Sequence, residues 1–137
     1  MSERKLLCFS TALLMFFMGL NSGLAQASTK PNSKFSLQLS FKSTPTAKPI
    51  NKTLSCNPAS GTHPKKTQAC SILRKMKEPF KAIDLNAICA QSIGGPESVR
   101  IKGTWNSRKV NSTFNKLNSC ETDRWKALAI VIDIQGK

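Results

Sequence analysis

Few side chains in this sequence could perform chemistry, and the cysteines are the most informative of them. The chain holds five cysteines, one histidine and only 7 acidic residues. No C-x-x-C pair or cysteine–histidine cluster offers the ligand spacing of a zinc site. A serine–histidine–acid triad would need His63 with Asp84 or Asp123, and no nucleophile-elbow motif accompanies them. We therefore expect no enzyme, no metal and no cofactor, and we interpret His63, between Thr62 and Pro64, as a structural turn residue.

Residues 1–27 have the three parts of a secretory signal peptide. Basic residues near the start precede an apolar run over residues 6–20, and Ala25–Ala27 forms a small-x-small cleavage site. The run is shorter than the ~20 residues that a bilayer span needs, which disfavours the alternative of an uncleaved anchor. We expect a mature domain over residues 28–137, secreted from the cell or released into a periplasm.

Removal of the signal would leave four cysteines, and an even number in a small exported domain is typical of disulfides. They are Cys56, Cys70, Cys89 and Cys120. The residues alone allow three pairings. The sequence therefore predicts two disulfides and leaves their pairing open.

Apolar periodicity predicts a single domain of class α+β around these cysteines. The predicted strands cover residues 35–41, 52–56, 99–105, 110–114 and 127–134. Apolar residues at three- and four-residue spacing predict a helix over residues 65–77. A short, irregular helical turn is expected over residues 80–88, leading to Cys89.

The segment from Thr53 to Cys70 carries an unusual combination of motifs. It reads T-L-x-C-x-P and then S-G-T-H-P over residues 60–64, and a G-x-W follows at residues 103–105. Asn118 stands two residues before the last cysteine. In these features the chain resembles the Streptomyces subtilisin inhibitor-like family of secreted proteinase inhibitors, over nearly the whole mature domain.

The resemblance implies a five-stranded antiparallel sheet packed by two helices, the pairings Cys56–Cys70 and Cys89–Cys120, and a homodimer. It also implies inhibition of an extracellular serine endopeptidase of the subtilisin type. The loop after Cys89 would enter the protease cleft as an extended, substrate-like segment that a disulfide holds in place.

The same resemblance assigns a reactive-site loop and the residues that support it. The loop is Ala90, Gln91, Ser92 and Ile93, and the support is Cys89, Cys120 and Asn118. Counting from Cys89 makes Gln91–Ser92 the scissile bond. The loop to Pro96 is one residue longer than the family's pattern, and counting back from Pro96 gives Ser92–Ile93 instead. We favour Gln91–Ser92 because the disulfide fixes the upstream register.

One assignment within the site has an alternative, and the loop residues limit the target. The amide of Asn118 either hydrogen-bonds to the loop backbone or belongs to an ordinary turn. Neither Gln91 nor Ser92 is basic, so a trypsin-like protease with an acidic pocket is not the expected target.

The high positive charge of the chain is a feature that protease inhibition does not explain. The chain has 21 Lys and Arg against 7 acids, a net charge of +14, without a run of five cations. Such a surface attracts polyanions by counterion release, but the few aromatics give no stacking platform for single-stranded nucleic acid. We expect non-specific polyanion contact without specific nucleic acid recognition. The alternatives are a secreted cationic protein that binds polyanions or cell surfaces or is antimicrobial, and an inhibitor of a metalloprotease.

Overall fold

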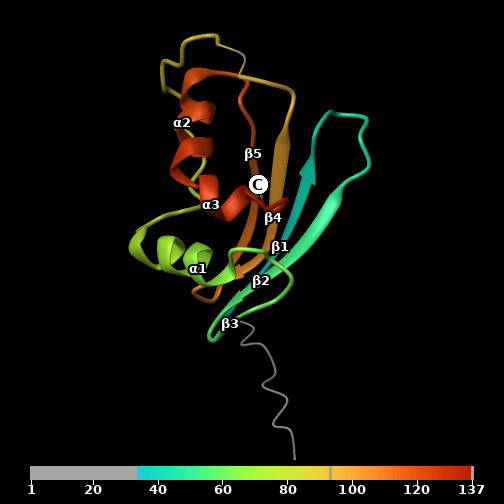
Figure 1. Cartoon of the computed structure of the whole chain (residues 1–137). Coiled ribbons are helices and arrows are strands. Elements are labelled where there is room, and N and C mark those ends of the chain that lie inside the picture. The colour runs from blue at the N-terminus through green and yellow to red at the C-terminus, as the bar shows by residue number, and fades with distance from the viewer. Residues whose placement is uncertain (1–33, 93, 137) are drawn as a thin grey trace, which may run out of the picture.

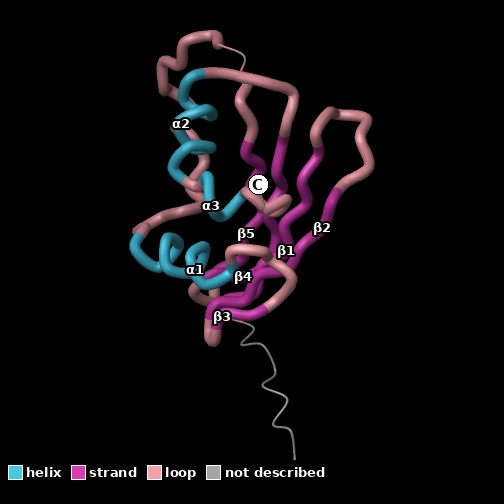
Figure 2. Tube along the Cα trace, viewed as in Figure 1, coloured by secondary structure: helices cyan, strands magenta, loops and turns pink. Residues whose placement is uncertain are grey.

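The computed structural model describes residues 34–92 and 94–136 and shows a sheet with helices on one face (Figures 1 and 2). The strands are β1 (Phe35–Lys42), β2 (Ile50–Cys56), β3 (Ala59–Ser60), β4 (Ser98–Trp105) and β5 (Arg108–Phe114). The helices are α1 (Lys66–Lys75), α2 (Ser119–Ala127) and α3 (Ala129–Ile132). The expected signal peptide over residues 1–27 lies outside the described residues, as does Ile93.

The sheet is antiparallel and has the strand order β3-β2-β1-β4-β5. Leu37 on the central strand β1 lies opposite Leu54 on β2, and Leu39 lies opposite Ile101 on β4. All four side chains are buried on the same face. A slip of one residue would turn this apolar set of β1 to the opposite face, so the alternating pattern fixes the register.

The β4–β5 hairpin turns at Asn106 and Ser107. Both residues have positive φ, 47° and 65°, as in a two-residue turn of type I′. Asn tolerates this region better than most residues, whereas Ser107 stands where such turns prefer glycine.

The core lies between the apolar face of the sheet and the three helices. Helix α1 contributes Ala69 and Leu73, and the disulfide Cys56–Cys70 joins it to β2 with the two Cα atoms 5.3 Å apart. The guanidinium of Arg74 donates to the carbonyl of Cys56, which adds a second link between the same elements.

The strand predicted over residues 127–134 is wrong, because this run forms the end of α2, the short helix α3 and the coil after it. Leu128, Val131 and Ile132 are buried, with the three- and four-residue spacing of a helix face. A short apolar run cannot be assigned to strand or helix from periodicity alone. The fifth strand is β3 instead, and the described residues form three helices rather than the two implied.

The helical turn expected over residues 80–88 is also wrong, because this segment contains no helix. The carboxylate of Asp84 accepts the N–H of Asn86 at 2.9 Å, a local turn that competes with helix formation. Leu85 and Ile88, which the helical turn would have packed inward, are instead fully exposed.

His63 has the structural role that the sequence predicted. Its side chain is buried, its Nε2 lies 2.8 Å from the carbonyl oxygen of Val131, and its Nδ1 accepts the N–H of Lys65 at 3.0 Å. Because Nδ1 is an acceptor, the ring is neutral and Nε2 is the donor. Burial lowers the pKa of His63 below its usual value.

Acid should therefore destabilise the fold through His63. The unfolded chain takes up a proton on this residue near its ordinary pKa of about 6.5, whereas the folded chain does so only at lower pH. The free energy of unfolding should fall as the pH drops below about 6.5, in a urea titration repeated between about pH 7.5 and about pH 5. His63→Gln should be less stable at neutral pH and should flatten this part of the profile; an unchanged slope would contradict the assignment.

Candidate functional site

The candidate loop, which begins at Cys89, lies against the start of α2 (Figure 1). Ala90, Gln91 and Ser92 are exposed, whereas Cys89 is partly buried. The predicted loop residues thus share one accessible segment, except that Ile93 lies outside the described residues.

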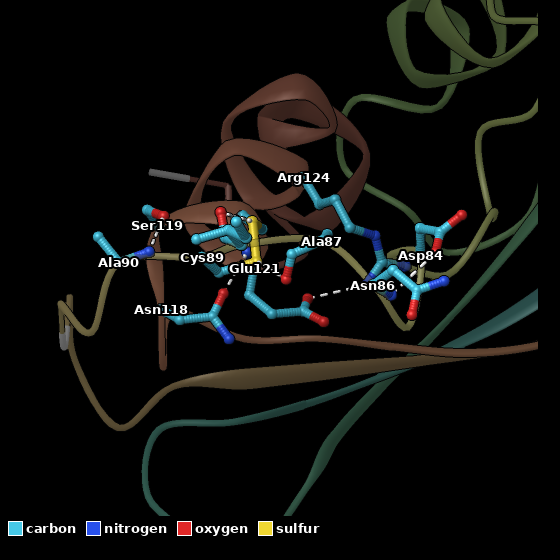
Figure 3. Close-up of a disulfide and its surroundings, with 11 residues drawn as sticks. Asp84, Asn86, Ala87, Cys89, Ala90, Asn118, Ser119, Glu121 and Arg124 are labelled. Atoms are coloured by element: carbon cyan, nitrogen blue, oxygen red, sulfur yellow. Dashed lines mark hydrogen bonds and ion pairs between the residues drawn. A yellow bond between two sulfur atoms is a disulfide. The ribbon is translucent and has the colours of Figure 1, made fainter.

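The upstream end of this loop is fixed to α2 by one covalent bond and two hydrogen bonds (Figure 3). Cys89 forms a disulfide with Cys120, and their Cα atoms are 5.5 Å apart. The N–H of Ala90 donates to Ser119 Oγ, and the N–H of Ser119 donates to the carbonyl of Ala90, each at 2.9 Å. One residue therefore satisfies both backbone groups of Ala90, so the chain has a fixed direction where it reaches Gln91.

The downstream end is held by a different contact. The N–H of Gly94 donates to the carbonyl of Lys116 at 2.7 Å. A Cβ on Gly94 would lie 3.0 Å from Lys116 Cβ, and Gly95 has a φ of +138°, where a Cβ would collide with the carboxylate of Glu97. The two glycines therefore allow the longer loop to return close to the chain that supports it.

An ion pair between Lys116 and Glu97 lies beside this downstream contact. Lys116 Nζ lies 3.1 Å from Glu97 Oε2 and 5.2 Å from the centre of the Trp125 ring. The backbone N–H of Glu97, and then Lys116, hold the pKa of the Glu97 carboxyl below its usual value. The carboxylate thus stays charged at neutral pH and helps to position the side chain of Lys116.

Asn118 is the N-cap of α2. Its Oδ1 accepts the N–H of Glu121 at 2.9 Å, which satisfies one of the free donors at the start of the helix. Among the described residues, the contact with the loop backbone is made by the next residue, Ser119. Asn118 therefore caps the helix that supports the loop, and within residues 34–92 and 94–136 its side chain forms no hydrogen bond with the loop backbone.

Helix α2 is in turn fixed to the sheet by Arg124. Its guanidinium lies 2.8 Å from the Glu121 carboxylate and 4.4 Å from the centre of the Phe114 ring on β5. The loop is therefore attached to a helix that is itself attached to the sheet.

The sequence missed two residues of this site, Ser119 and Lys116. A signal for Ser119 was present, because a disulfide between Cys89 and Cys120 brings the neighbours of both cysteines together. The role of Lys116 depends on its backbone carbonyl, to which its side-chain type gives no clue. Across residues 34–92 and 94–136, no group of three His, Cys, Asp or Glu is placed to hold a metal ion. Over the same residues, no helix is long and apolar enough to cross a bilayer.

A family model described as subtilisin inhibitor-like matches residues 32–118, from before β1 to the N-cap of α2. The chain belongs to the subtilisin inhibitor-like family. The match includes the loop after Cys89, so the resemblance predicted from the sequence motifs is confirmed. Membership of a family of proteinase inhibitors also agrees with the prediction that the chain is not an enzyme.

Two named relatives and one solved structure are similar to parts of this chain. The chain is 30% identical over 80 residues to subtilisin inhibitor-like protein 1 of Streptomyces cacaoi, covering 55% of this chain and 72% of that protein. It is 35% identical over 83 residues to subtilisin inhibitor-like protein 7 of Streptomyces ambofaciens, covering 58% and 75%. A crystal structure of Streptomyces caespitosus sermetstatin in complex with Bacillus licheniformis subtilisin aligns with a TM-score of 0.46 at 23% identity, covering 72% of this chain and 96% of that one.

Proposed function

We propose that this subtilisin inhibitor-like protein inhibits a subtilisin-like serine endopeptidase by placing residues 90–93 in the protease cleft as a substrate-like segment. The observation that carries this proposal is the double attachment of Ala90 to Ser119 beside the disulfide. Ordering a free peptide costs about 1–2 kcal/mol per residue, and a loop already held in one shape avoids part of that cost.

Gln91 is the proposed specificity residue, and Gln91–Ser92 is the proposed scissile bond. Gln91 is the second residue after Cys89, directly beyond the fixed backbone of Ala90, and it is exposed. Its uncharged side chain suits a protease whose pocket accepts many residue types. Upstream, the fully exposed Leu85 and Ile88 offer apolar surface that a bound protease can bury.

A titration against subtilisin tests this proposal. The oxidised protein is added to subtilisin of known active-site concentration, residual peptidase activity is measured, and the mixture is analysed by mass spectrometry. We expect stoichiometric loss of activity and, after long incubation, a single slow cut at Gln91–Ser92. Rapid degradation at the loop with activity retained would show a substrate and not an inhibitor. Survival of the intact protein without inhibition would show that the loop does not enter this cleft.

We also infer that the protein is exported and that residues 1–27 are removed. The basic start, the short apolar run and the Ala25–Ala27 site support this inference. Intact mass of the exported protein should correspond to a chain that begins at Ser28. The homodimer stays a prediction, and sedimentation velocity of the same sample checks it.

Ser119→Ala should weaken inhibition without unfolding the protein. The substitution removes the acceptor of the Ala90 N–H, a hydrogen bond whose net contribution is about 0.5–1.5 kcal/mol. The inhibition constant for subtilisin should rise about 2- to 12-fold. Ser43→Ala, an exposed serine in the β1–β2 connection, is the matched control and should leave the constant unchanged. Equal constants for the two variants would exclude Ser119 as a support of the loop.

A further inference from the structure

A groove lies beside the β4–β5 turn, on the helical side of the sheet. Phe35 at the start of β1 pairs with Trp105 at the end of β4, and it shares a face of β1 with the buried Leu37. The segment that follows α1 forms the opposite wall with Met76 and Phe80. The groove encloses about 620 Å³, which is within the range of about 300–1,000 Å³ that is usual for ligand sites.

The floor of this groove is apolar and recessed. Phe35 and Phe80 contact Trp105 edge-to-face, with ring centres 5.1 Å and 6.1 Å apart. Ser112 Oγ donates to the carbonyl of Phe80 at 2.8 Å, which holds this wall against β5. The three rings and the side chain of Met76 are each half-buried. A single inserted side chain can therefore reach them, whereas a flat surface cannot.

The rim of the groove is positively charged. It contains one acid, Glu78, and five cations, Arg74, Lys77, Lys81, Arg108 and Lys109. Glu78 lies 3.7 Å from Lys81, and Arg74 donates to a backbone carbonyl. Among the described residues, no carboxylate forms an ion pair with Lys77, Arg108 or Lys109. We call these last three residues the rim cations.

We propose that the groove binds an acidic peptide segment that inserts one aromatic or large aliphatic side chain between its walls. The apolar floor buries this side chain, and the rim cations pair with the carboxylates that flank it in the peptide. Positive charge alone would attract any polyanion, whereas the floor stabilises only a partner that also presents an apolar group. The combination therefore defines the chemistry of the partner.

Other occupants complement the groove less well. Residues 28–33, which precede β1 in the chain, read S-T-K-P-N-S and contain no acid and no large apolar side chain. A second copy carries the same net charge of +14, which opposes its approach. Bases stack on open ring faces, but these rings are half-buried and meet one another at near right angles. A bilayer is reached by protruding apolar side chains, and none of the apolar residues that line the groove is exposed.

The groove and the candidate loop lie at opposite ends of β4. The loop comes before Ser98, where β4 begins, and the groove contains Trp105, where β4 ends. The eight residues of this strand separate the two by about 23 Å. Figure 1 shows the β4–β5 turn next to α1 and the candidate loop at the other end, beside α2. A peptide and a protease could therefore bind at the same time, so this site is independent of the proposed function.

The test compares two triple variants that remove the same charge. Lys77→Gln, Arg108→Gln and Lys109→Gln remove the rim cations, whereas Lys48→Gln, Lys66→Gln and Lys126→Gln remove exposed cations outside the groove. The probe is a fluorescein-labelled heptapeptide with phenylalanine between two runs of acidic residues, and its control has glycine at the centre. Binding of the oxidised protein is measured by fluorescence anisotropy at about 0.1 M salt.

We expect the unaltered protein to bind the phenylalanine peptide at least ~10-fold more tightly than the glycine peptide. The rim variant should bind the phenylalanine peptide at least ~10-fold more weakly than the unaltered protein, and the control variant should change less than ~3-fold. Subtilisin inhibition, measured on the same samples, should be equal in all three proteins, so its failure in all of them would refute only the proposed function.

Four outcomes would overturn the proposal. Equal affinities for the two peptides would mean that no side chain is inserted. Equal weakening of both variants would mean that binding follows net charge and not the groove. Tighter binding of a single-stranded oligonucleotide of equal charge would mean that the partner is a nucleic acid. Self-association in sedimentation that only the rim variant abolishes would mean that a second copy fills the groove.

Discussion

Replacing Cys89 and Cys120 by alanine should raise the inhibition constant for subtilisin by about 100-fold or more. The disulfide and the paired hydrogen bonds of Ala90 act on the same end of the loop, so losing the covalent bond frees several backbone residues. Restoring the freedom of two residues costs about 3 kcal/mol on binding, which is roughly 100-fold in affinity. The variant should also be cut quickly at Gln91–Ser92.

The other disulfide provides a matched control. The sequence separations are 14 for Cys56–Cys70 and 31 for Cys89–Cys120, so the chain-entropy model gives similar losses of about 3 and about 4 kcal/mol in unfolding free energy. Because Cys56–Cys70 joins β2 to α1, its removal should lower stability and leave inhibition nearly intact at temperatures where the variant is folded. If both double variants lose inhibition equally, general stability and not loop anchoring controls binding.

Gln91→Lys should convert the protein into an inhibitor of trypsin-like proteases. Their specificity pocket carries an acidic group, which an uncharged Gln91 cannot pair. A lysine buried against that group is worth about 3 kcal/mol or more, so the inhibition constant for trypsin should fall by about 100-fold or more. Inhibition of subtilisin should change less, and both constants come from the same titration with two enzymes.

Ser92→Lys is the paired variant that decides the register of the loop. If Gln91–Ser92 is the scissile bond, a lysine at position 92 follows the cut and should not produce tight inhibition of trypsin. If Ser92–Ile93 is the scissile bond, Ser92→Lys and not Gln91→Lys will gain it. A gain in neither variant would mean that the loop does not present a single residue to the pocket.

Much of the fold could be predicted because local patterns and tertiary packing agree there. The alternation over residues 35–41 gives β1, and the strands predicted over residues 99–105 and 110–114 correspond to β4 and β5. The run over residues 127–134 was misassigned because it is apolar at almost every position, so the sequence hides the helical spacing of the residues that are buried, Leu128, Val131 and Ile132. The N-cap at Asn118, 9 residues before Ala127, begins the helix α2 that reaches this run. Whether this helix forms depends on where it packs against the rest of the protein.

The site could be predicted as a segment but not as a set of contacts. The resemblance located residues 89–93 and the disulfide, and the structure places residues 89–92 beside α2. It could not separate Asn118 from Ser119, because both side chains offer an oxygen and only the direction of the chain entering α2 decides which one reaches Ala90. The contact between Gly94 and Lys116 involves backbone atoms alone, so no side-chain motif encodes it.

The two-ended attachment of the loop has a consequence for the cut protein. If the Gln91–Ser92 bond is hydrolysed, the new carboxylate stays next to Ala90, which the disulfide and Ser119 hold, and the new amine stays on the segment that Gly94 joins to Lys116. Hydrolysis then releases little chain entropy, and the two new ends remain at high effective concentration. Intact and nicked forms should therefore reach a measurable equilibrium in the presence of catalytic protease, approached from either form.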